Sequence, residues 1–102
     1  MDGSEKHDIS LAEAAMMTKN YRDQMTRTQV KGGYFSIYGL LKLMNQPECI
    51  GLRYYYGLNE TGGQEIVLVG VDAAGNDIVD GCIAEMSAKC PPNCSTDNPL
   101  NS

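Results

Sequence analysis

The chain has few of the residues that most often carry catalysis or fill large cores. Among its 102 residues there is no tryptophan, one phenylalanine and one histidine, against six tyrosines and six methionines. No apolar run approaches the roughly 20 residues of a membrane-spanning helix. The opening MDGSEKHDIS lacks the basic-then-apolar order of a signal peptide. We therefore expect a cytoplasmic protein with no membrane partner.

Positive charge is scarce in the second half of the chain. Residues 1–46 hold six basic and five acidic side chains, whereas residues 47–102 hold two basic and eight acidic ones, and the net charge is −5. A nucleic-acid-binding protein needs a basic stripe to neutralise phosphates. The sequence has none, so we expect no nucleic-acid partner.

Recognisable catalytic motifs are also missing. The sequence contains no HExxH, GxSxG, EF-hand or phosphate-binding glycine loop. The lone His7 lies in a polar stretch that we expect to be disordered, which argues against a Cys–His catalytic pair. Three acids, Asp72, Asp77 and Asp80, could surround a cation, but acids at turns and strand ends are far commoner. We expect no cofactor, and the sequence leans away from an enzyme without excluding one.

Two helices are predicted in the first half. Ser10 and Glu13 form a capping box, and apolar residues at helical spacing extend the first helix from about residue 11 to about residue 26. Ser36 is a plausible N-cap of a second, shorter helix. Pro47 ends it, because the residue before a proline is disfavoured in the helical conformation.

The second half predicts three strands joined by two matched turns. The segments GLNETGG and GVDAAGN each place an Asx residue three positions before a glycine, at Asn59/Gly62 and Asp72/Gly75. This spacing is typical of a type I turn closed by a left-handed glycine in a β-bulge. Two such turns predict an antiparallel β-meander. The first hairpin should pair Tyr54 with Leu68.

In the second hairpin we expect Val71 opposite Asp77, Val69 opposite Val79 and Val67 opposite Gly81. The register beyond Val79 is open, because Asp80 would fall on an apolar face. Either the strand stops near Val79 or a bulge at Gly81 rotates it.

Alternation of side chains along the strands assigns two faces. One is apolar and is the expected seat of both helices: Ile50, Leu52, Tyr54, Tyr56, Ile66, Leu68, Ile78 and Cys82. The other is the predicted interaction surface: Arg53, Tyr55, Val67, Val69, Val71, Asp77 and Val79. A salt bridge from Arg53 to Asp77 or to a partner subunit is favoured over an anionic ligand beside Tyr55, because a mid-strand charge needs a partner.

Two short helices cover only one face of a small sheet. An uncovered face with four valines would be a larger apolar patch than soluble monomers usually expose. We therefore expect a cover, which could be a second copy, the C-terminal tail, a protein partner or a ligand. A homodimer is favoured because symmetric dimers are the commonest soluble oligomers.

Four cysteines leave a second functional hypothesis open. Cys90 and Cys94 enclose two prolines and an asparagine, so they could form a local disulfide, supply two metal ligands or stay reduced. Cys49 and Cys82 are expected to be small core residues.

The predicted fold is α+β, with two N-terminal helices packed on one face of a three-stranded antiparallel β-meander in two layers. Residues 1–8 are expected to be disordered, residues 9–89 to form a single domain and residues 90–102 to form a Cys/Pro tail. The predicted function is a non-enzymatic protein-interaction module that self-associates or binds a partner through the valine-rich face. The alternative is a small metal-binding or thiol-redox module that uses Cys90 and Cys94.

Four segments in this order, TKNYR, QPECIGLRYYYGL, LVGVDAAGNDI and CPPNC, carry a resemblance that extends over most of the chain. By these segments the chain resembles a group of small uncharacterised bacterial proteins. The resemblance implies no activity, substrate or cofactor.

Overall fold

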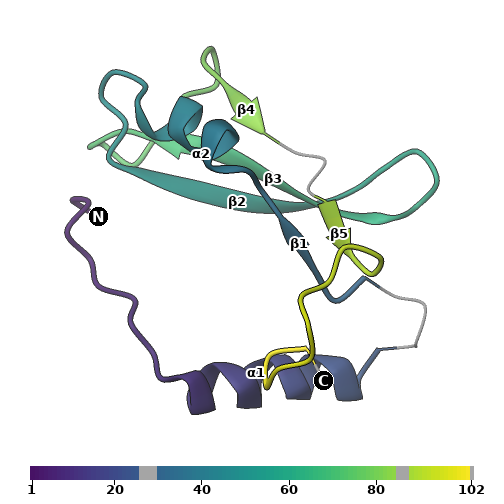
Figure 1. Ribbon diagram of the computed structural model, residues 1–102. Helices are drawn as coiled ribbons and strands as arrows, with labels where there is room; N and C mark the ends of the chain where they lie inside the picture. The colour runs from purple at the N-terminus through teal and green to yellow at the C-terminus, as the bar shows by residue number, and fades with distance from the viewer. Residues whose placement is uncertain (26–29, 85–87, 102) are drawn as a thin grey trace. The chain divides into compact units, whose positions relative to one another are not determined.

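The computed structural model describes residues 1–25, 30–84 and 88–101. Its elements are α1 (Leu11–Asp23), β1 (Gly32–Tyr34), α2 (Ile37–Met44), β2 (Gly51–Leu58), β3 (Gln64–Val71), β4 (Ile83–Ala84) and β5 (Ala88–Cys90) (Figure 1). Both sheets are antiparallel, so the predicted α+β class is confirmed. No helix in these residues is both long and apolar enough to cross a membrane.

The chain divides into two compact units. The hairpin unit comprises Met1–Glu5 and Phe35–Ser87, and the terminal unit comprises Lys6–Tyr34 and Ala88–Ser102. The hairpin unit holds α2 and the β2–β3–β4 sheet, whereas the terminal unit holds α1 and the two-stranded β1–β5 sheet. The predicted single domain over residues 9–89 stays a prediction.

Helix α1 begins at the predicted capping box. The Glu13 N–H donates to Ser10 Oγ at 3.0 Å, and the Ser10 N–H donates to Glu13 Oε1 at 3.2 Å. The helix ends at Asp23, and residue 26, where we expected its end, lies outside the described residues. Its half-buried side chains recur at helical spacing: Ala14, Ala15, Thr18 and Arg22.

Helix α2 begins at the predicted cap and carries the most buried side chain of the hairpin unit. The Gly39 N–H donates to Ser36 Oγ at 3.0 Å, and the helix ends at Met44, ahead of Pro47. Figure 1 shows α2 against the β2–β3–β4 sheet, and α2 contacts all three of these strands. Leu43 on α2 is only 1% exposed, so this helix–sheet contact forms the core.

The first hairpin has the predicted register. Tyr54 lies opposite Leu68 and Tyr56 opposite Ile66. The Gly62 N–H donates to the Asn59 carbonyl at 2.9 Å, and Gly62 has a positive φ of 84°. The carboxamide oxygen of Asn59 accepts from the main-chain N–H groups of Thr61 and Gly63. This is the predicted type I turn with a glycine bulge.

The second turn is built in the same way, with Asp72 in place of Asn59. The Asp72 carboxylate accepts from the N–H groups of Ala74 and Asn76, and Gly75 has φ 85°. Val71 then pairs with Asp77, as predicted. Sequence spacing alone therefore located both turns.

The predicted third strand is wrong beyond Asp77. The chain turns away at Val79–Gly81 and returns as β4, so Val69 pairs with Ile83 and not with Val79, and Gly81 does not pair with Val67. The side chain of Gln46 accepts from the Cys82 N–H at 2.8 Å and stabilises this excursion. Residues 85 and 86, the end of the predicted third strand, lie outside the described residues.

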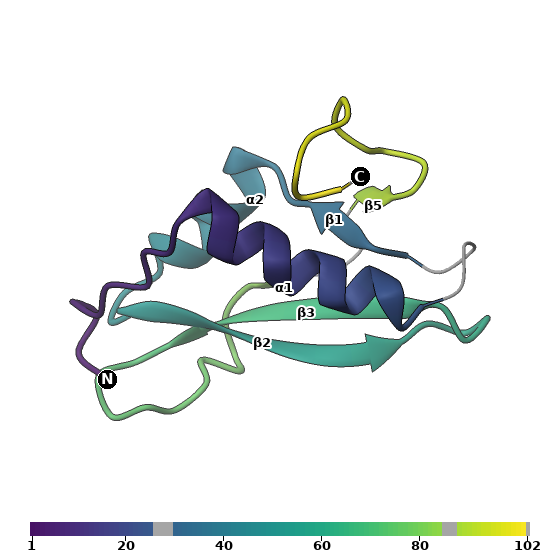
Figure 2. The same ribbon diagram turned by 90° about the horizontal axis from the view of Figure 1, so that it is seen from below.

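The terminal unit contains a ladder that the sequence did not predict. Gly32 of β1 pairs with Cys90 of β5, and Tyr34 pairs with Ala88 (Figure 2). Gly32 and Gly33 follow the end of α1 and are the first two residues of β1. Glycine is a poor strand former by propensity. The three-residue strand β1, which begins Gly-Gly, can therefore be recognised only from its pairing with β5.

Candidate interaction surface along strand β2

Three polar side chains that the sequence placed on one face lie together. Arg53 Nη1 donates to Asp77 Oδ1 at 2.5 Å in an ion pair, and the Tyr55 hydroxyl donates to Asp77 Oδ2 at 2.5 Å. Arg53 Nη2 also donates to the Gly75 carbonyl at 3.2 Å. Strand β2 supplies the arginine and tyrosine, and the bridge between Val71 and Asp77 brings the carboxylate across β3. The predicted Arg53–Asp77 salt bridge is confirmed.

These contacts shift the ionisation of all three groups. The hydrogen bond from Tyr55, together with Arg53, holds the pKa of Asp77 below its ordinary value. The hydrogen bond to Asp77 raises the pKa of Tyr55, and it also raises the pKa of Arg53. Near neutral pH Asp77 and Arg53 are therefore charged, and Tyr55 keeps its proton. Because each oxygen of Asp77 already has a partner, the cluster is better suited to fixing β2 than to reacting.

The valines of the predicted interaction surface do not form an exposed patch. Val69 and Val71 are only 4% and 3% exposed within a single chain, so their predicted exposure is wrong. Val67 is half-buried. Val79 is exposed, but it lies in the turn before β4 and does not pair with Val69. The sequence pattern could not show that the chain covers its own valines.

The exposed side chains of the sheet lie instead along β2. The exposed fractions are 36% for Leu52, 58% for Tyr54, 48% for Tyr55, 72% for Tyr56 and 76% for Leu58. The rings of Tyr54 and Tyr56 meet edge to face, with centroids 5.7 Å apart. Leu52, Tyr54 and Tyr56 belong to the face that we expected the helices to cover, and strand alternation puts Leu58 on the same face.

The chain following α2 meets that face near Gly70. Gly70, opposite Leu52, leaves room there for other side chains. A Cβ added at Gly70 would lie 2.9 Å from Gln46 Nε2 and 3.1 Å from Cys49 Sγ. The run Tyr54-Tyr55-Tyr56 was the available sequence signal for an exposed aromatic strand. Tyrosine suits a position where its ring contacts apolar groups and its hydroxyl faces water.

Strand β2 is also an edge strand. In the described residues the sheet order is β2–β3–β4, so β2 has β3 on one side only (Figure 2). An edge strand presents a row of main-chain N–H and C=O groups to any chain that can pair with it. Proteins often protect such edges with lysine or proline, and β2 contains neither.

The sequence analysis did not recognise that Glu65 is buried. It is only 8% exposed, and Asn59 Nδ2 donates to its Oε2 at 3.1 Å. Alternation puts Glu65 on the same face as Val67 and Val69, and this was the available signal. The contact ties the first turn to the base of β3.

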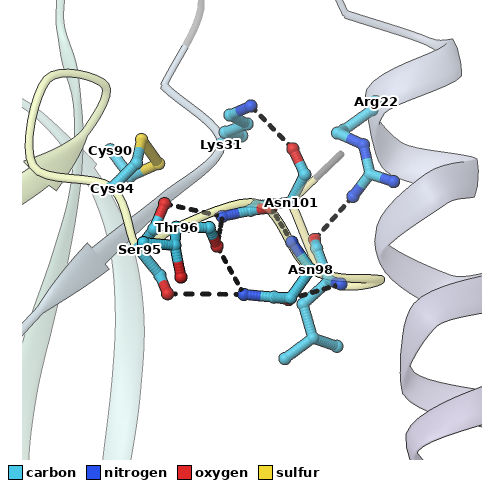
Figure 3. The surroundings of a disulfide bond; sticks show 9 residues. Arg22, Lys31, Cys90, Cys94, Ser95, Thr96, Asn98 and Asn101 are labelled. Atoms are coloured by element: carbon cyan, nitrogen blue, oxygen red, sulfur yellow. Dashed lines mark hydrogen bonds between the residues drawn. A yellow bond between two sulfur atoms is a disulfide. The ribbon is translucent and has the colours of Figure 1, made fainter.

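The two C-terminal cysteines form a disulfide in the terminal unit. Cys90, the last residue of β5, is bonded to Cys94, and Figure 3 shows this bridge beside the C-terminal segment. In that segment Asn98 and Asn101 bond to the segment's own main chain. Arg22 and Lys31 donate to the carbonyls of Leu100 and Asn101.

The other two cysteines are free and half-buried. Cys49 and Cys82 both belong to the hairpin unit, and Cys49 Sγ donates to the Gly51 carbonyl at 3.2 Å. Among the described residues, no three His, Cys, Asp or Glu side chains gather closely enough to hold a metal ion.

No protein-family model matches the chain, and no curated protein or solved structure matches it either. The resemblance to small uncharacterised bacterial proteins stays a prediction. The geometry of β2 and of the disulfide must therefore support any functional proposal.

Proposed function

We propose that the chain is a non-enzymatic protein-interaction module that binds a polypeptide along the edge strand β2. One observation supports this most directly: β2 is an eight-residue edge strand whose five large apolar or aromatic side chains are all at least 36% exposed. A long apolar edge is a template for strand addition, in which main-chain hydrogen bonds supply affinity and alternate side chains supply specificity.

The side chains of β2 suit such a contact. Tyrosine is enriched at protein interfaces because its ring contributes a large contact area while its hydroxyl tolerates water. Arg53 and Tyr55 are held in place by Asp77, so the strand loses little conformational freedom when a partner binds. The proposed interaction surface therefore consists of the exposed residues of β2 and no longer includes the buried Val69 and Val71.

Photo-crosslinking at Tyr54 tests this function. A benzophenone amino acid replaces Tyr54 in one variant and Tyr38 in a control, because Tyr38 is 73% exposed but lies on α2. Both variants are irradiated in cells that make the chain at its native level, and adducts are identified by mass spectrometry. We expect one defined protein adduct from position 54 at a yield several times that from position 38. Equal yields, or no adduct at position 54, would overturn the proposal.

A thiol-redox module is a second candidate, and the Cys90–Cys94 disulfide favours it. Two glutathione thiols would supply two electrons and two protons, giving two protein thiols and one glutathione disulfide. A metal-binding module would use the same residues only after this reduction, since thiolates are the ligands.

Thiol titration separates these possibilities. In the unfolded, unreduced chain we expect two reactive thiols, Cys49 and Cys82, and four after treatment with glutathione. Four thiols without a reductant would contradict the disulfide. Stoichiometric zinc in the reduced chain would support the metal-binding form instead.

The finer features predicted from sequence are retained as proposals. Two-layer packing, with α1 and α2 on one face of the sheet, stays a proposal, and the strand contacts of α2 support it for that helix. A helix packed on a face of the sheet does not block the main-chain edge of β2, so this edge can still pair with another strand. Cytoplasmic localisation is likewise proposed on the sequence alone.

A further inference from the structure

We infer that the polypeptide bound along β2 is a second copy of this chain. The two β2 strands would pair antiparallel about a two-fold axis at Tyr55, with Tyr54 of each chain opposite Tyr56 of the other. This inference rests on the proposed function, because it names the partner of the same edge. It would join the two three-stranded sheets into one six-stranded sheet.

The turn geometry shows which main-chain groups of β2 face outward. The Asn59 N–H donates to the Gly63 carbonyl at 2.8 Å, so these two residues are a hydrogen-bonded pair. Hydrogen-bonded and non-hydrogen-bonded pairs alternate along an antiparallel ladder. The even-numbered residues of β2 therefore direct their N–H and C=O groups away from β3: Leu52, Tyr54, Tyr56 and Leu58.

The sequence of β2 is nearly the same read in either direction from Tyr55. Leu52 and Leu58 lie three positions away on the two sides, and Tyr54 and Tyr56 lie one position away. In an antiparallel pair of identical strands, a residue before the axis faces the residue equally far after it. A two-fold axis at Tyr55 therefore pairs leucine with leucine and tyrosine with tyrosine, as an isologous interface requires.

Charge favours the same axis. An axis at Arg53 would place the two arginines opposite each other, and like charges directly opposite destabilise a sheet. With the axis at Tyr55, Arg53 lies opposite Gly57, which has no side chain to compete with the Arg53–Asp77 pair.

Other nearby axes use less of the strand. An axis at Tyr54 leaves Leu58 opposite Ile50, outside β2, and an axis at Tyr56 leaves Arg53 opposite Asn59 in the turn. The Tyr55 axis alone keeps all of Leu52–Leu58 within the ladder.

The inferred pairing also accounts for the exposed tyrosines. Residues opposite each other in a ladder point to the same face. Tyr54 and Tyr56 of both chains would thus form one row, and the edge-to-face contact within each chain would continue across the junction. The net charge of −5 on each chain opposes association, so added salt should strengthen the dimer by screening.

Sedimentation equilibrium tests whether a second copy binds. We expect twice the single-chain mass of 11.1 kDa for the full chain, and the single-chain mass for Tyr54→Lys, which places an added charge in the tyrosine row. Tyr38→Lys, at an exposed position on α2, should keep the doubled mass. Circular dichroism confirms that each variant is folded.

Disulfide trapping tests the register of the pairing. In a Cys49→Ser, Cys82→Ser background, Tyr55→Cys puts two cysteines on the axis. Facing residues of a non-hydrogen-bonded pair have Cα atoms about 4.5 Å apart, within the range of a disulfide. Leu58→Cys puts its two cysteines at opposite ends of the ladder, roughly 20 Å apart at about 3.4 Å per residue. We expect a covalent dimer from Tyr55→Cys only.

The outcomes separate this inference from the function on which it rests. A single-chain mass up to about 1 mM, the weak end of specific association, would overturn the second-copy inference, while a crosslink from Tyr54 to another protein would preserve the proposed function. A doubled mass with no Tyr55→Cys dimer, or with equal trapping at position 58, would also overturn the inference. A single-chain mass with no Tyr54 crosslink would overturn both.

Discussion

Asp77 connects the second turn to the exposed strand. Its two carboxylate oxygens accept from Arg53 and Tyr55, so one side chain fixes two positions of β2. The register of the turns predicted the approach of Arg53 and Asp77, because it placed both on one face. The bond from Tyr55 was not predicted, since a strand pattern assigns faces without giving hydroxyl directions.

Replacing Asp77 by asparagine should lower the free energy of unfolding at neutral pH. The folded state lowers the pKa of Asp77, so its contribution is present above the unfolded value of about 3.9 and is lost as pH falls through the folded value. The difference in stability between wild type and Asp77→Asn should therefore shrink below about pH 4. Urea unfolding at a series of pH values measures this difference, and one that stayed constant into acid would contradict the assignment.

Tyr55→Phe gives the matching test in alkali. The folded state raises the pKa of Tyr55, so the stability due to its hydroxyl is present below the unfolded value of about 10 and is lost as pH rises through the folded value. The difference between wild type and Tyr55→Phe should be constant at neutral pH and shrink only above about pH 10. A difference that already shrank near pH 8 would indicate another group.

At the scale of elements, the two turns determine the β2–β3 ladder. Each turn needs a left-handed residue, and Gly62 and Gly75 supply it. This local requirement made the turns and the first register predictable. The excursion after Asp77 was not predictable, because it depends on Gln46, 36 residues before Cys82, and no local pattern reports such a contact.

Gly62→Ala should destabilise the chain by about 1 kcal/mol, the cost of a left-handed conformation for a residue with a Cβ. The added methyl would meet no atom within 4 Å, so the effect isolates the backbone conformation. Gly57→Ala is the control, since its added Cβ also meets nothing and its φ is not left-handed. We expect Gly57→Ala to be neutral or stabilising in thermal unfolding. An equal loss in both variants would contradict the turn assignment.

At the scale of the whole molecule, the division into two units escaped prediction. It depends on the pairing of β1 with β5, two three-residue strands about 55 residues apart along the chain. The helices, both turns and the first hairpin came from local signals: caps, glycine positions and alternation. The burial of Val69 and Val71 could not be predicted from local signals, because the residues that cover a sheet face are distant in sequence.

Replacing both Cys90 and Cys94 by serine should destabilise the terminal unit by at most about 2 kcal/mol, the loop-closure value for so short a loop. The cysteines are four positions apart, so the bridge restricts the unfolded chain only slightly. Hydrogen exchange should show the loss at β1 and β5, with β2 and β3 unchanged. Equal loss of protection throughout β2 and β3 would contradict a local role for the bridge.

The order of the units along the chain has a consequence for biosynthesis. Most of the hairpin unit, Phe35–Ser87, is inserted between the two parts of the terminal unit. During translation the β2–β3 hairpin, joined by a five-residue turn, is complete before β5 is made. Strand β1 must wait for its partner until Cys90 has left the ribosome. The nascent chain should therefore present the edge of β2 before the terminal unit is complete, and any co-translational pairing of two chains would begin at that edge.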